Sequence, residues 1–264
     1  MLLSEIFMFS GTVQSIVCVV LLVTTWCLLP QWRTLQNFIS VNQVITGTLF
    51  IFILTSLQFT DMPYEMMPLT HYILITSVCW SVSSSLLAYL RLVLVYVGKI
   101  SCEKRKAVIF AYGNAGIILG ISLVIVPNLL FENYSFFDHF LKILLAIHIY
   151  MLVLNFIIFI RIVFSVLSCC KTKKMSKRKI KHVASLIGVA FICDSLLILI
   201  PVLLFFSISN VIYYLVVFFI CHRLVFQTMF VLFRRSTRLH WKLYINKRKR
   251  RKLNHDFLAL RDKL

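Results

Sequence analysis

The sequence predicts an all-α membrane protein: a seven-transmembrane helix bundle with its N-terminus outside, its C-terminus in the cytoplasm and a short amphipathic C-terminal helix. Three observations predict it. The 264 residues are 60% hydrophobic and 14% charged, whereas soluble domains have about 45–50% apolar residues. The apolar residues form continuous runs of about 20 residues or more, long enough to cross a bilayer as helices, and a β-barrel would show alternation instead. Finally, Lys and Arg gather in every second connection between these runs.

Seven apolar segments define the organisation of the chain. We predict one bundle over residues 1–233 and a basic, amphipathic cytoplasmic tail over residues 234–264. The first residues, "MLLSEIFMFS", lack the basic region and the cleavage site of a signal peptide, so we assign them to the outer end of the first helix. The predicted helices cover about 6–30, 37–59, 71–99, 107–130, 139–168, 183–207 and 211–233.

The basic residues predict the orientation of the bundle. Arg33 lies in the first connection, Lys104 to Lys106 in the third, and seven cations between Lys171 and Lys181 in the fifth. By the positive-inside rule, these connections and the tail face the cytoplasm. The net charge of +19 then matches the anionic inner leaflet of a lipid bilayer, for which we expect the plasma membrane, and requires no nucleic-acid partner. A possible glycosylation site at Asn133 falls in the fourth connection, on the predicted outer side.

Polar and charged side chains inside the predicted spans form the expected intramembrane network. Asp194 and Arg223 each lie about 10 or 11 residues from the inner ends of the sixth and seventh helices, hence about 15 Å deep. A short connection makes these helices neighbours, so we predict an ion pair between the two residues. In the other interpretation, Arg223 extends to the inner interface and Asp194 is protonated. Asn37 and Asn42 lie on the second helix, where we expect Asn42 to need a partner on a neighbouring helix.

The second helix carries the most specific motif. "RTLQNFISVN" resembles the start of the second helix in rhodopsin-like G-protein-coupled receptors, with matches at Arg33, Thr34 and both asparagines, while Gly47 stands where those receptors have an acidic residue. The stretch "QNFISVN" also resembles the corresponding motif of secretin- and adhesion-type receptors, with Ser40 in place of a His. We therefore identify a divergent relative of the superfamily, with the rhodopsin-like branch favoured and the secretin- or adhesion-type branch second.

This resemblance implies a receptor that senses a small-molecule, peptide or membrane-borne ligand within the bundle and signals to a heterotrimeric G protein. Arg91 on the third helix resembles the Arg of the family's D-R-Y motif, with Leu90 and Leu92 as neighbours. It either contacts the G protein or anchors the helix at the inner interface. The candidates for facing the G protein are Arg91, Lys174, Lys177, Arg178 and Arg238.

The ligand pocket is expected in the outer half of the bundle, where the resembling families bind ligands. On the third helix, Thr76, Cys79, Trp80 and Ser83 recur at helical spacing and share one face. Plain helix packing is the alternative role, because small polar residues are common between membrane helices. The further pocket candidates are His148, Tyr213, Tyr214 and Phe218.

The sequence gives no sign of enzyme chemistry. It contains no metal-ligand spacing, phosphate-binding loop or paired carboxylates, so we expect no catalytic residue, metal or cofactor. The competing hypothesis to the receptor is a non-signalling multi-pass membrane protein, such as a pseudoreceptor, a trafficking scaffold or a small transporter.

Overall fold

Every regular element of the computed structural model is a helix over the residues that it describes, which are 2–59, 67–92, 103–125, 146, 149–150, 153–165 and 210–261. The predicted all-α class is confirmed there. The elements are α1 (Leu2–Leu28), η1 (Pro30–Trp32), α2 (Leu35–Phe59), α3 (Met67–Leu92), α4 (Glu103–Val108), η3 (Ile109–Gly113), α5 (Asn114–Ile125), α9 (Asn210–Leu232) and α10 (Arg235–Arg261). A further apolar helix covers Val153–Ser165.

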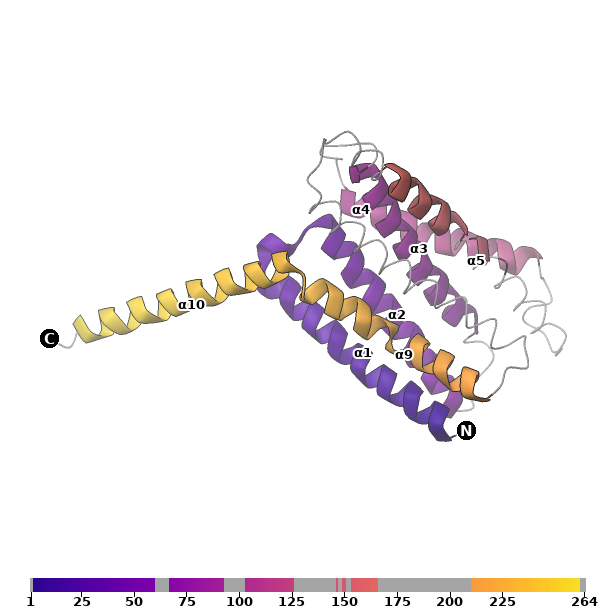
Figure 1. Cartoon of the computed structure of the whole chain (residues 1–264), viewed down its shortest axis with the longest axis horizontal. Helices are drawn as coiled ribbons and strands as arrows, with labels where there is room; N and C mark the ends of the chain where they lie inside the picture. Colours follow the sequence, from indigo (N-terminus) through magenta and orange to yellow (C-terminus); the bar gives the residue numbers. More distant parts are fainter. Residues whose placement is uncertain are drawn as a thin grey trace.

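The helix α2 is central in the described bundle. Helices α1, α2, α3 and α9 run side by side (Figure 1), and α2 packs against each of the other three. Two apolar clusters form the core. One contains Ile51, Cys79 and Trp80 and joins α2 to α3, η3 and α5. The other contains Leu22 and Val44 and joins α1, α2 and α9. Because α2 contributes to both clusters, it connects the two halves of the bundle.

Two of the described helices are long and apolar enough to cross a membrane, Leu3–Leu28 in α1 and Leu35–Ser56 in α2. A third candidate span is the pair Val217–Leu232 and Arg235–Arg250, whose axes bend by 62°. These helices support membrane association. The expected helix 183–207 lies outside the described residues, as do parts of 107–130 and 139–168, so the number of seven spans stays a prediction.

The helix boundaries follow local chemistry. The first helix ends at Leu28 because Pro30, which has no N–H to donate, instead opens the short 3-10 turn η1. The third helix begins at Met67, earlier than the expected residue 71, and is described as far as Leu92. The fourth expected segment begins at Glu103, and its α-helix is interrupted by the π-helical turn η3. Such turns are inserted into α-helices often at functional sites.

The tail forms α10, a helix of 27 residues, which is longer than the short helix expected. It projects away from the bundle (Figure 1), and the connection from α9 consists of Phe233 and Arg234. Its first turns pack against the bundle, through the buried Thr237 and the partly buried Trp241 and Tyr244. The amphipathic character expected of the tail stays a prediction.

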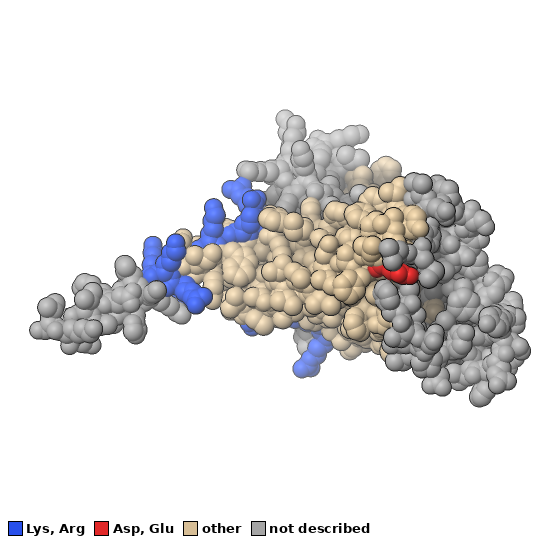
Figure 2. Space-filling view, turned by 90° about the horizontal axis from the view of Figure 1, so that it is seen from below, with Lys and Arg blue, Asp and Glu red and all other residues tan. Residues whose placement is uncertain are grey.

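The charges of the described residues separate along the bundle. Figure 2 shows Lys and Arg gathered toward the end from which α10 leaves, and an acidic side chain near the opposite end. The helix α1 has Glu5 in its first turn, and its 27 residues place its two ends about 40 Å apart. We call the end formed by η1, the start of α2, Lys104 and the junction of α9 with α10 the basic end.

Candidate functional site

A buried polar cluster at the basic end centres on Trp32, whose side chain is 1% exposed. Its indole Nε1–H donates a hydrogen bond of 3.0 Å to Thr237 Oγ1, and the Thr237 hydroxyl donates one of 3.0 Å to the carbonyl of Val231. The carbonyl of Trp32 accepts a hydrogen bond of 2.7 Å from Asn37 Nδ2. These three bonds fasten η1 to α2, α9 and α10, so the orientation of the tail helix depends on the start of α2.

Two cations at the basic end, Arg33 and Lys104, contact α1. Arg33 donates from Nε to the carbonyl of Trp26 at 2.9 Å and from Nη2 to that of Cys27 at 3.0 Å. It thereby satisfies carbonyl groups at the C-terminus of α1, where a positive charge is also favoured by the helix dipole. Lys104 Nζ lies 5.1 Å from the ring centroid of Trp26 and 5.8 Å from that of Phe38, within the range of cation–π attraction. Arg33 of the first basic connection and Lys104 of the third therefore lie at the same end of the bundle. The positive-inside rule requires the basic connections to lie on one side.

A row of aromatic rings leads from the basic end into the bundle. The row runs in the order Trp32, Trp26, Phe38, Trp80 and Tyr112. The distances between the centroids of successive rings are 6.3 Å, 5.8 Å, 5.9 Å and 5.8 Å. These separations are typical of favourable aromatic pairs. We call Trp32, Trp26, Phe38, Trp80 and Tyr112 the aromatic row. It connects η1 with α1, α2, α3 and finally the π-helical turn η3.

A pair of buried amides joins α2 to α9. Gln227 Nε2 donates to Gln43 Oε1 at 2.7 Å, and the two residues are 6% and 3% exposed. This pair was not expected from the sequence, although a glutamine inside each of two apolar segments is a visible signal. Asn42, which we expected to need a partner on another helix, donates instead to the carbonyl of Phe38 in its own helix at 2.8 Å. The residue that reaches the neighbouring helix is the next one along the chain.

Arg223 is buried at 3% exposure, beside a glycine of α2. A Cβ atom at Gly47 would lie 3.3 Å from Arg223 Nη2 and 2.8 Å from Leu224 Cδ2. The glycine thus leaves room for the guanidinium at the position where the resembling receptors have an acidic side chain. Asp194, the partner expected for Arg223, lies outside the described residues, so the ion pair stays a prediction.

The four pocket candidates of α3 are brought together, but within the core. Thr76, Cys79, Trp80 and Ser83 are between 0% and 7% exposed. Both hydroxyls donate to carbonyls of α3 itself, Thr76 to Tyr72 at 2.7 Å and Ser83 to Cys79 at 2.8 Å. Trp80 packs between Phe38 and Tyr112. These side chains are therefore packed among described residues, and their role in a ligand pocket stays a prediction.

The remaining candidates are distributed more widely. Phe218 stacks on His222 with 4.2 Å between ring centroids and meets Phe7 of α1 edge-on at 5.5 Å, and Tyr214 is half-buried on the same helix. Arg238 is exposed on α10. Tyr213 and Arg91 belong to the described helices α9 and α3, but their side chains lie outside the description. The candidates wholly outside it are Asn133, His148, Lys174, Lys177 and Arg178.

Among the described residues, no group of three or more His, Cys, Asp or Glu side chains is arranged to hold a metal ion. At the junction of α9 and α10, burial lowers the pKa of the Arg234 guanidinium. It stays protonated near neutral pH, because the ordinary pKa of arginine is far higher.

Comparison of the chain with protein-family models and with curated proteins finds no match.

Proposed function

We propose that this protein is a seven-transmembrane receptor of the G-protein-coupled type, which senses a small or membrane-borne ligand in its bundle and signals to a G protein at the plasma membrane. The observation that carries the proposal is the position of two motif residues. Arg33 and Asn37 both bond to backbone carbonyls at the basic end, and Asn37 does so on Trp32, the residue that holds α10. These two motif residues therefore lie where α1, η1 and α2 meet the base of α10.

The aromatic row supplies a route by which a change in the bundle would reach the basic end. Trp80 of α3 lies edge-on to Phe38 of α2, and Phe38 contacts Trp26, which contacts Trp32. Packed rings have few alternative arrangements at the density of a protein interior. A shift of α3 at Trp80 would therefore displace Phe38 and alter the contact that orients α10.

The burial of the α3 face favours a second candidate, a non-signalling multi-pass membrane protein. A ligand that used Thr76 or Ser83 would have to compete with the helix carbonyls to which their hydroxyls donate. The ring of Trp80 also packs against the rings of Phe38 and Tyr112. A protein with this packing and no ligand would serve as a scaffold or a pseudoreceptor.

The experiment that separates the two candidates is a measurement of basal second-messenger level in cells that produce the full chain. For a receptor, Arg91→Ala lowers the basal signal to that of untransfected cells while the amount at the cell surface is unchanged. Arg105→Ala is the matched control, because Arg105 is an exposed cation of α4 near the same end. Absence of any basal signal in the parent protein, with normal surface delivery, would favour the non-signalling candidate.

A further inference from the structure

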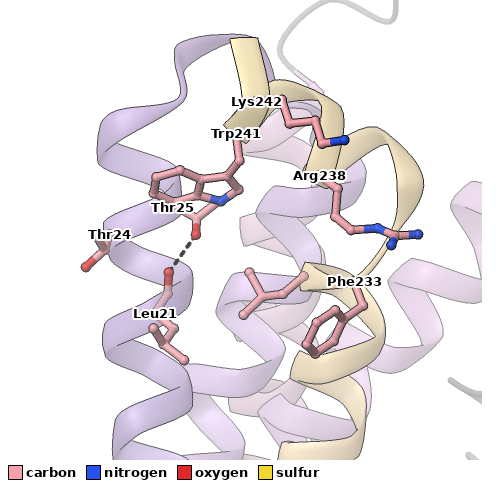
Figure 3. A pocket seen from close by; sticks show the side chains of 8 residues that line it. Leu21, Thr24, Thr25, Phe233, Arg238, Trp241 and Lys242 are labelled. Atoms are coloured by element: carbon pink, nitrogen blue, oxygen red, sulfur yellow. Dashed lines mark hydrogen bonds between the residues drawn. The ribbon is translucent and has the colours of Figure 1, made fainter. Parts of the chain in front are cut away.

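A pocket of about 450 Å³ lies in the angle between α1, α9 and α10. Figure 3 shows Trp241 reaching from α10 toward Thr25 of α1, above Leu21 and Phe233. Arg238 and Lys242 belong to the same pocket and lie one turn apart on α10, and their charged groups extend from the helix toward the same side in Figure 3. The pocket is therefore lined mainly by apolar atoms, and Arg238 and Lys242 border it with their charged groups extending away from Trp241.

Two exposed apolar strips lead away from this pocket along the bundle. Each strip belongs to one helix face, because its members are spaced by three or four residues. The side chains are between 46% and 59% exposed. The strip on α1 consists of Val13, Val17 and Leu21, and the strip on α9 and at its end consists of Phe226, Met229 and Phe233. The α1 strip lies within the candidate membrane span Leu3–Leu28.

We propose that this pocket binds one anionic glycerophospholipid, with its headgroup between Arg238 and Lys242 and its acyl chains along the two strips. Arginine matches phosphate oxygens with paired N–H donors, and lysine adds a point charge. A tryptophan is favoured between headgroup and hydrocarbon because its ring is apolar and its N–H is polar. The volume falls within the range of small-molecule sites in proteins, about 300–1,000 Å³.

The combination of features selects a lipid over other anions. A free phosphate would use the two cations but would leave the apolar floor and both strips exposed. A general attraction between α10 and an anionic surface would use all of its cations equally, because such attraction depends on the number of charges near the surface. A bound lipid instead depends on Arg238 and Lys242 in particular, since these two residues line the pocket.

The test measures quenching of Trp241 fluorescence in the full-length protein, reconstituted in nanodiscs of phosphatidylcholine. Brominated phosphatidylserine or brominated phosphatidylcholine is added at equal bromine content, and the signal of a Trp241→Phe variant is subtracted. We expect phosphatidylserine to quench at a lower mole fraction, by a factor of about five for each of the two cations. Equal quenching by the two brominated lipids in the parent protein would overturn the proposal.

Matched variants separate the pocket from the charge of the helix. The double variant R238Q/K242Q is expected to lose the preference for phosphatidylserine. The control K247Q/R248Q removes the same charge from exposed positions further along α10 and is expected to keep the preference, as is the charge-conserving exchange R238K/K242R. If both glutamine double variants lose the preference equally, the attraction is a property of the whole helix and the pocket site is wrong. All four substituted positions are exposed, and circular dichroism of each variant verifies that the helices are intact.

Discussion

The helices α1 and α2 are both long and apolar enough to cross a membrane, yet the protein buries 28% of the most apolar stretch of α1 and 61% of that of α2. Their positions explain the difference, because α2 packs against α1, α3 and α9, whereas α1 packs mainly against α2 and α9. On α1 the buried positions include Thr12 and Ser15, while valines and isoleucines are exposed. Both helices are apolar enough to be candidate spans, and on α1 the placement of small polar residues helps to distinguish the buried face.

The largest expected effect compares neighbouring positions on α2. Ile51 is 1% exposed and Phe52 is 51% exposed. We expect Ile51→Ala to lower the free energy of unfolding by about 2–5 kcal/mol, because it leaves a cavity in the core. Phe52→Ala should change it by less than about 0.5 kcal/mol, because the side chain leaves no cavity. The measurement is denaturation of the protein in mixed micelles.

The same measurement on α1 sharpens the comparison. Leu22 is 1% exposed and Leu21 is 48% exposed, so Leu22→Ala should be costly and Leu21→Ala nearly neutral. Equal costs for the two members of either pair would contradict the assignment of buried and exposed faces.

An intermediate effect is expected where α1 approaches α9 most closely. A Cβ atom at Gly11 would lie 2.5 Å from Cys221 Cβ and 3.0 Å from the Cys221 carbonyl oxygen. Gly11→Ala should therefore push the two helices apart and lower the free energy of unfolding by about 1–3 kcal/mol, as overpacking typically does. Thermal unfolding in detergent provides the measurement.

The control for this prediction is Gly116→Ala in α5, where an added Cβ meets no atom of the described residues within 4 Å. Alanine favours a helix over glycine by up to about 1 kcal/mol, so this variant should be slightly more stable than the parent. A loss of stability in Gly116→Ala as large as that in Gly11→Ala would show that the close approach of α1 to α9 is not the cause.

The smallest effect is expected at the amide pair between α2 and α9. Gln43→Leu and Gln227→Leu should each lower the free energy of unfolding by about 0.6 kcal/mol and by no more than about 1.7 kcal/mol, the average and the maximum measured for hydrogen bonds between membrane helices. Each single change removes the hydrogen bond between the two amides, and the second change then has no such bond left to break, so the double variant should lose less than the sum of the two. Simple additivity in this double-mutant cycle would indicate that the two amides do not depend on each other.

The sequence was sufficient to locate elements whose ends are marked by chemistry. The ranges 6–30, 37–59 and 211–233 agree with α1, α2 and α9 to within a few residues, because proline and basic residues interrupt the apolar runs. The meeting of Arg33 with the third basic connection at one end was also implied by the order of the charges. Such features depend on position along the chain alone.

Features that depend on the rotation of a helix about its axis were harder to predict. Thr76, Cys79, Trp80 and Ser83 do share one face of α3, and all four are buried among the described residues, while their role in a ligand pocket stays a prediction. Asn42 and Gln43 are adjacent in sequence, and only the rotation of α2 decides which of them points toward α9. Lipid and protein interior are both apolar, so hydropathy gives little information about this rotation.

The tail helix has a mechanical consequence. Its 27 residues form a rod about 40 Å long, anchored at one end only, so a tilt of about 5° at its base moves the far end by about 3 Å. A displacement of the Trp32–Thr237 contact is therefore amplified along the rod. A fluorophore or spin label near the C-terminal end of α10 would act as a pointer, reporting changes at the base that are too small to detect directly.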